Sequence, residues 1–134
     1  MNNSKHDEFH AMNPYLFEQL DRENDSYWIV KDYFNSIRWP QEFLEGMSRL
    51  VKKIGWVPEG AGCIFPDFVD ADPSGHFKGV KFWYGNYEIV IAEDKFIELA
   101  SLAFDLFAKE HPEYKGEVDN FRHELSQNFD KETD

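Results

Sequence analysis

One segment near the middle of the chain constrains the fold more than any other. In residues 79–92, GVKFWYGNYEIVIA, two runs of β-branched and aromatic residues flank the pair Gly85-Asn86. Glycine at the first central position of a two-residue loop is what a type II′ turn requires. The segment therefore predicts a β-hairpin with strands at residues 80–84 and 87–91.

The register of this hairpin gives its two faces different chemistry. One face carries the cross-strand pairs Tyr84 with Tyr87, Phe82 with Ile89 and Val80 with Ile91, and the other carries Lys81, Trp83, Glu88 and Val90. We expect the first face to meet the core, and we expect another segment to cover the tryptophan of the second. Because a lone hairpin is only marginally stable, a third strand is expected, for which residues 62–65 are the best candidate.

Four other stretches have the apolar periodicity of helices. Asn24 or Asp25 can cap the first of them. The second follows Pro40 and is expected to end at Gly55, and its apolar face consists of Phe43, Leu44, Met47, Leu50, Val51 and Ile54. Residues 93–110 are apolar around more than half of the helix circumference, which is typical of a central helix packed on several sides. A last helix follows.

These elements predict an α+β fold, in which about four helices pack around a small antiparallel sheet that contains the hairpin. A chain of 134 residues can bury a core without disulfide bonds, and 42% of its residues are hydrophobic, which argues against global disorder. We expect residues 1–134 to form a single domain with disordered ends at residues 1–13 and 130–134.

The acidic composition disfavours several classes of function. The chain has 14 Lys and Arg residues against 26 Asp and Glu residues, a formal net charge of −12. Phosphate groups repel such a surface, so neither direct nucleic-acid binding nor binding to anionic membranes is expected. The sequence lacks a signal-peptide pattern and a long apolar run, and we therefore expect a cytoplasmic protein.

Residues capable of chemistry form no recognisable catalytic motif. The five histidines are scattered, and Cys63 is the only cysteine, set among apolar residues that favour a buried, inert thiol. Residues 70–75 match the first half of a calcium-binding loop, but Lys81 stands where that loop needs a bidentate glutamate. We expect neither catalysis nor a cofactor or metal ion. A small metal-dependent enzyme or regulator using the 70–76 loop is the alternative.

The most suggestive surface is an acidic loop beside the hairpin. Asp67, Asp70 and Asp72 have no base among them, and Pro66, Phe68, Val69 and Pro73 lie between or beside them. Apolar anchors next to anionic groups suit an interface with a basic partner, although turn chemistry explains the pattern almost equally well. We predict a partner-binding surface of these three aspartates, with Trp83 as its aromatic anchor and Glu88 beside it.

The order of several segments resembles a known family. DRENDSYWIVKDYFNSI, GAGCIFPD, GVKFWYGNYEIVIAEDKFIELASLAF and KEHPE follow one another between about Tyr15 and Glu113. This order is similar to that of CdiI-type immunity proteins of bacterial contact-dependent growth inhibition, in particular the group described as ribonuclease toxin immunity proteins. Ala92 stands where members of the group tend to have serine, which weakens the cap of the long helix.

The resemblance implies a protein that binds the C-terminal nuclease domain of a cognate CdiA-type toxin and protects the producing cell. We expect a 1:1 complex, a monomer when unbound, and occlusion of a basic active-site cleft by the acidic surface. Net negative charge suits this role, because an RNA-cleaving domain needs a cationic cleft. An acidic scaffold with a different partner is a further alternative.

Overall fold

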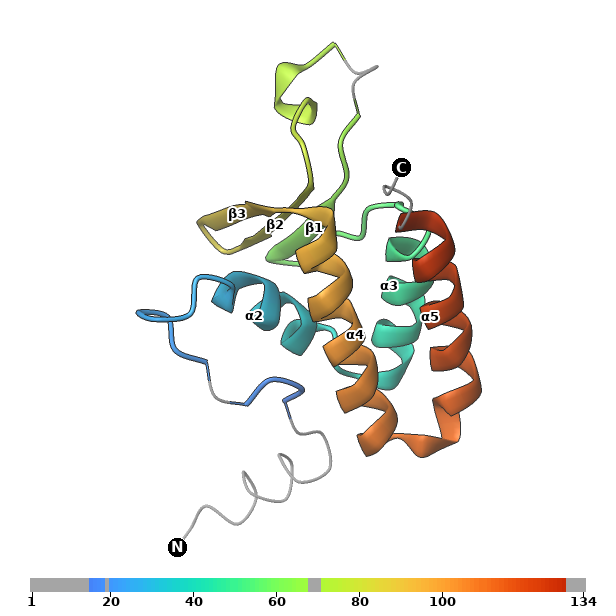
Figure 1. Ribbon diagram of the computed structural model, residues 1–134. Helices are drawn as coiled ribbons and strands as arrows, with labels where there is room; N and C mark the ends of the chain where they lie inside the picture. Colours follow the sequence, from blue (N-terminus) through green and yellow to red (C-terminus); the bar gives the residue numbers. More distant parts are fainter. Residues whose placement is uncertain (1–14, 19, 68–70, 130–134) are drawn as a thin grey trace, which may run out of the picture.

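The computed structural model describes residues 15–18, 20–67 and 71–129, and it combines helices with one antiparallel sheet (Figure 1). In chain order its elements are α2 (Trp28–Ser36), α3 (Pro40–Leu50), β1 (Ala61–Ile64), a 3-10 helix (Pro73–Gly75), β2 (Val80–Tyr84), β3 (Tyr87–Ile91), α4 (Glu93–Glu110), a second 3-10 helix (Pro112–Tyr114) and α5 (Lys115–Phe129). The predicted α+β class is confirmed, and the bounds of the hairpin strands and of α4 are those expected.

The sheet has the predicted register and the order β1-β2-β3. Both pairings are antiparallel, and Phe82 lies opposite Ile89. Gly85 has a φ of +63°, whereas Asn86 has a negative φ, which is the combination that a type II′ turn needs. The third strand is present, although it begins and ends one residue before the predicted 62–65.

All four described α-helices lie on one side of the sheet (Figure 1). The covered side, here called the inner face, carries Ala61, Cys63, Val80, Phe82, Tyr84, Tyr87, Ile89 and Ile91. α2 packs directly against it, and the rings of Tyr33 and Phe34 meet the ring of Phe82 with centroids 5.2 and 6.0 Å apart. These edge-to-face contacts fix α2 to the central strand.

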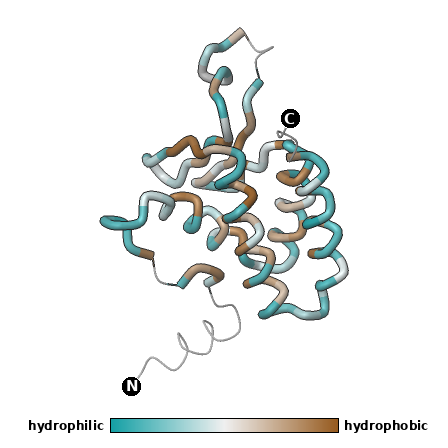
Figure 2. Tube along the Cα trace, viewed as in Figure 1, coloured by the Kyte–Doolittle hydropathy of each residue, from teal (hydrophilic) through white to brown (hydrophobic). Residues whose placement is uncertain are grey.

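The other half of the core lies between α3, α4 and α5. Phe43 of α3 stacks on Phe107 of α4, with ring centroids 4.0 Å apart and planes at 9°. Figure 2 shows hydrophilic colours along much of α5, whose buried residues are Val118, Phe121, Leu125 and Phe129. This one-sided pattern is that of a helix covering a core. None of the helices that the structure describes has the length and apolar character to cross a membrane.

The start of α2 differs from the prediction. Neither Asn24 nor Asp25 caps the helix: the N-cap is Tyr27, which makes no side-chain cap hydrogen bond. Asp25 instead accepts a hydrogen bond from the Tyr27 backbone N–H at 2.9 Å and so closes the turn that precedes α2. A hydrogen bond from Lys31 lowers the pKa of Asp25. The sequence signal therefore marked a real turn, but it placed the N-cap two or three residues before Tyr27.

The end of α3 also departs from expectation. Lys53 adopts a left-handed conformation with a φ of +60°, and the N–H groups of Lys53 and Ile54 donate to the carbonyls of Leu50 and Arg49. These two bonds form a Schellman motif, which ends the helix before Gly55 is reached. Ile54 consequently points away from the core and is 45% exposed, so its predicted place in the buried stripe is wrong.

The segment before α2 is fixed by a buried amide. Asn35 is buried in α2; its Oδ1 accepts a hydrogen bond from the N–H of Phe17 at 2.8 Å, and its Nδ2 donates to the carbonyl of Phe17 at 2.9 Å. Leu16 is buried beside this clamp. The ends expected to be disordered, residues 1–13 and 130–134, lie outside the described residues.

Candidate binding surface

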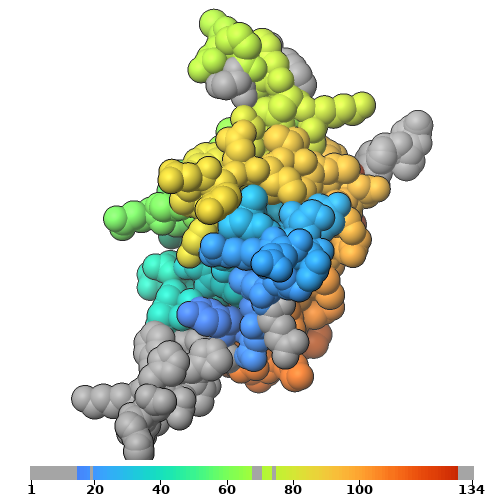
Figure 3. All heavy atoms as spheres, turned by 90° about the vertical axis from the view of Figure 1, so that its left-hand side faces the viewer, coloured from blue at the N-terminus to red at the C-terminus, as the bar shows by residue number. Residues whose placement is uncertain are grey.

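The side of the sheet that faces away from the helices is the candidate surface. Strand alternation places Gly62, Ile64, Lys81, Trp83, Glu88 and Val90 there, and these residues are here called the outer face. Figure 1 shows the described helices on the opposite side, and Figure 3 shows the hairpin at the molecular surface. Four of these six residues are the ones that the sequence assigned to the mixed face of the hairpin.

Trp83 lies on a glycine of the neighbouring strand. Gly62 is its cross-strand partner, and a Cβ atom added to Gly62 would come within 2.2 Å of the indole ring. Glycine is therefore required for the indole to lie against β1. The expectation that something must cover Trp83 is met in part, because the strand backbone covers one side of the ring and the residue remains partly exposed.

Glu88 completes a compact group with the tryptophan. It lies directly opposite Trp83 on β3 and is exposed. Within the described part of the chain Glu88 forms no ion pair. The predicted neighbourhood of these two residues is confirmed by the register.

The predicted aspartates lie apart from this pair, in the loop that joins β1 to β2. The described parts of this acidic loop (residues 65–79), which are residues 65–67 and 71–79, extend away from the helices beyond the end of the sheet (Figure 1). Asp67 and Asp72 are both exposed. The backbone N–H of Asp67 donates to the carbonyl of Gly75 at 2.8 Å, which joins the two arms of the loop. Asp70 lies outside the described residues.

Lys81 connects the acidic loop with the outer face. Its Nζ atom lies 4.9 Å from the centroid of the Phe77 ring, on the returning arm of the loop. Lys81 lies on the same face of β2 as Trp83, two residues earlier in the chain. With Lys81 and Glu88 both present, the outer face is mixed in charge, and the acidic character belongs to the loop.

The structure also places the residues that were candidates for catalysis or metal binding. Cys63 is fully buried on the inner face, and burial raises the pKa of its thiol well above the usual range, as expected for an inert thiol. Among the residues that the structure describes, no three His, Cys, Asp or Glu side chains are grouped so as to hold a metal ion. The alternative metal loop at residues 70–76 includes Asp70 and therefore lies partly outside them.

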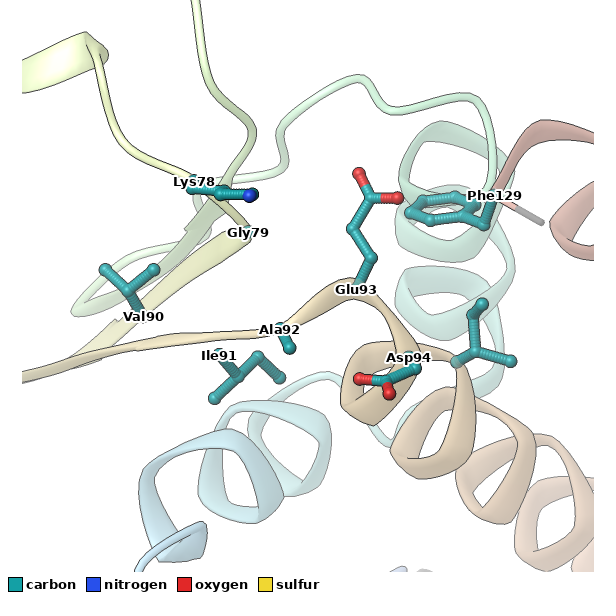
Figure 4. Close-up of a pocket in the computed structure, with 9 residues that line it drawn as sticks. Lys78, Gly79, Val90, Ile91, Ala92, Glu93, Asp94 and Phe129 are labelled. Atoms are coloured by element: carbon teal, nitrogen blue, oxygen red, sulfur yellow. The ribbon is translucent and has the colours of Figure 1, made fainter. Parts of the chain in front are cut away.

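The sequence did not reveal an open cavity where β3 meets α4. It measures about 790 Å³ and is lined by Lys78, Gly79, Val90, Ile91, Ala92, Glu93, Asp94, Ile97 and Phe129. Figure 4 shows the side chain of Phe129 approaching from α5, on the side away from β3. Glu93 is held by Lys53, whose Nζ lies 3.3 Å from its carboxylate. The exposed Val90 on the mixed face was the only local sign of this cavity.

A partly exposed tryptophan opposite an exposed carboxylate, on the same molecule as a protruding acidic loop, is a surface suited to protein recognition. Residues 26–121 match the model of a family described as CDI immunity protein, and this match covers well over half of the chain. The chain belongs to this family, as the order of its segments predicted. It is an immunity protein of contact-dependent growth inhibition, and its partner is a cognate toxin. A search of curated proteins found no match.

Proposed function

We propose that this immunity protein neutralises a C-terminal ribonuclease domain of its cognate CdiA-type toxin. The acidic loop enters the basic active-site cleft in a 1:1 complex, and the outer face contacts the rim of the cleft through Trp83 and Glu88. The protein acts in the cytoplasm of the producing cell, without catalysis of its own.

The position of the acidic loop is the observation that carries this proposal. Asp67 and Asp72 are exposed on a segment that extends beyond the sheet, with its two arms joined by the Asp67–Gly75 hydrogen bond. A protruding anionic segment can occupy a cleft that a flat acidic surface cannot enter. The partly exposed Trp83 nearby supplies the kind of aromatic contact that often dominates the binding energy of an interface.

The charge of the whole chain supports the same partner. A ribonuclease attracts a polyanion, and a protein with a net charge of −12 competes for the same electrostatic field. Opposite charges mainly accelerate association, so the association rate should fall steeply as salt is added.

The test compares two variants with equal net charge. Asp67→Asn, Asp70→Asn and Asp72→Asn together remove the three negative charges of the acidic loop. The control replaces Glu110 at the end of α4, Glu113 in the 3-10 helix that follows and Glu117 in the first turn of α5 by glutamine. The proposal expects the cognate toxin in the gene immediately upstream. Its C-terminal domain serves as the partner in stopped-flow association and in an RNA-cleavage assay.

The loop variant should associate at least about tenfold more slowly at low salt and protect RNA poorly, whereas the control should resemble the wild type. Equal rates for both variants would overturn the proposed site. A toxin domain that cleaves no RNA would overturn the ribonuclease assignment. Saturable binding of calcium, zinc or manganese in calorimetry would favour the alternative use of the 70–76 loop.

A further inference from the structure

The two edges of the sheet use their backbone groups differently. At the β1 edge the N–H of Trp56 donates to the carbonyl of Cys63 at 3.0 Å, and the N–H of Cys63 donates to the carbonyl of Trp56 at 3.1 Å. The segment around Trp56 therefore closes this edge with an isolated bridge. A further strand cannot pair with Cys63 without displacing Trp56.

Among residues 15–18, 20–67 and 71–129, no segment closes the β3 edge in this way. Tyr84 and Tyr87 flank the two-residue turn and form a hydrogen-bonded pair, and such pairs alternate with non-hydrogen-bonded pairs along the ladder. The backbone N–H and C=O groups of Glu88 and Val90 therefore point away from β2. No backbone hydrogen bond joins these groups to any other part of the described chain.

The side chains of this edge are also accessible. Val90 is 42% exposed, Tyr87 is 56% exposed and Glu88 is exposed. Proteins protect open edges with charges, bulges, prolines or covering segments. In β3, Glu88 is the one such feature, and its negative charge favours an incoming strand that carries a base.

The open edge ends at the cavity between β3 and α4. Val90 and Ile91 belong both to the strand and to the wall of the cavity, and Ile97 and Phe129 add apolar surface beyond them. A strand paired with β3 passes beside Val90 and reaches this cavity. Because most of the lining residues are apolar, a large apolar side chain fits the cavity better than a charged one.

We propose that the free edge of β3 binds an extended segment of the cognate toxin as a fourth strand. Its backbone pairs with the N–H and C=O groups of Glu88 and Val90, a basic side chain lies beside Glu88, and a large apolar side chain enters the cavity. This is recognition by strand addition. It rests on the proposed function for its partner and adds a backbone contact that the acidic loop does not provide.

Amide hydrogen exchange tests the pairing in the unaltered protein. The amides of Glu88 and Val90 should exchange rapidly in the free protein and at least about tenfold more slowly in the complex with the toxin domain. The Ile89 amide, which already bonds to β2, is the internal control. Unchanged exchange at Glu88 and Val90 in a complex that still forms would overturn the inference and leave the proposed function standing.

A backbone variant provides a second test. Val90→Pro removes the outward N–H without breaking a bond to β2, as an edge position allows, and Val90→Ala keeps this N–H while shortening the side chain. The proline variant should lose about tenfold in affinity and the alanine variant less, with melting temperatures that show both are folded. Equal affinity of Val90→Pro and wild type would contradict strand addition. Protection that rises with protein concentration in the free protein would assign the edge to a second copy.

Discussion

Phe82 and Trp83 are neighbours in the chain, yet they belong to opposite environments. Phe82, on the inner face, is fully buried against Tyr33 and Phe34 of α2. Trp83, on the outer face, rests on Gly62 and remains partly exposed. One strand therefore places alternate residues in two environments, and we propose that its inner face serves folding and its outer face recognition. Substitutions on the two faces should consequently affect different measurements.

The largest effect on stability is expected on the inner face. Phe82→Ala removes a fully buried ring and should lower the free energy of unfolding by about 3–5 kcal/mol. Urea denaturation measures this change. The variant molecules that remain folded should bind the toxin domain as the wild type does, because Phe82 does not reach the surface. A large loss of affinity with little loss of stability would contradict the assignment of the inner face to folding.

The outer face should give the reverse result. Trp83→Ala should weaken toxin binding by about 2 kcal/mol, or roughly thirtyfold in Kd, because a partly exposed aromatic residue provides much of the contact. Its free energy of unfolding should change by less than about 2 kcal/mol, since one side of the ring already faces solvent. Calorimetric titration and urea denaturation measure the two effects.

A matched variant separates the position of Trp83 from its presence. Gly62→Ala keeps the indole but displaces it, because the new Cβ atom would lie 2.2 Å from the ring. It should weaken binding in the same direction as Trp83→Ala. Wild-type affinity in both variants would remove Trp83 from the interface.

The smallest effect is expected where the sheet passes into α4. Ala92 is the N-cap of α4 in an extended conformation, with φ −68° and ψ 155°, and it provides no side-chain cap hydrogen bond. Ala92→Ser should raise the free energy of unfolding by about 1 kcal/mol, because its hydroxyl can accept a bond from the first turn. Thermal denaturation measures the gain. Ala92→Val, which cannot cap, should show none, and equal stability of the two variants would contradict this account.

The sequence predicted those secondary-structure elements that are determined by residues close together in the chain. The hairpin register follows from the turn at Gly85 and from the strict alternation of the strand residues. Residues 93–110 form α4 because their apolar residues recur at helical spacing and the helix has to end near His111. The start of α2 and the end of α3 differ from the predictions because both depend on local hydrogen bonds that the residue types alone do not specify. Lys53 takes a conformation usually left to glycine, so the composition around Gly55 misplaced the end of α3.

For the candidate surface, the sequence predicted only those neighbours that are also close together in the chain. Trp83 and Glu88 lie opposite each other because of the hairpin register, and this register could be predicted from the sequence. The contact between Trp83 and Gly62 depends on how β1 pairs with β2. The cavity combines residues from 78–79 and 90–97 with Phe129 of α5, which is more than 30 residues further along the chain. Such tertiary neighbours leave no periodic signal in one sequence.

The hydrogen bond between Asp67 and Gly75 has a consequence for how such a protein can diversify. Because this bond fixes both arms of the loop, the identities of residues 68–74 can change while the strands that bear them keep their register. Under the proposed function, substitutions at a few positions of this loop can match a changed toxin without altering the sheet that carries the loop.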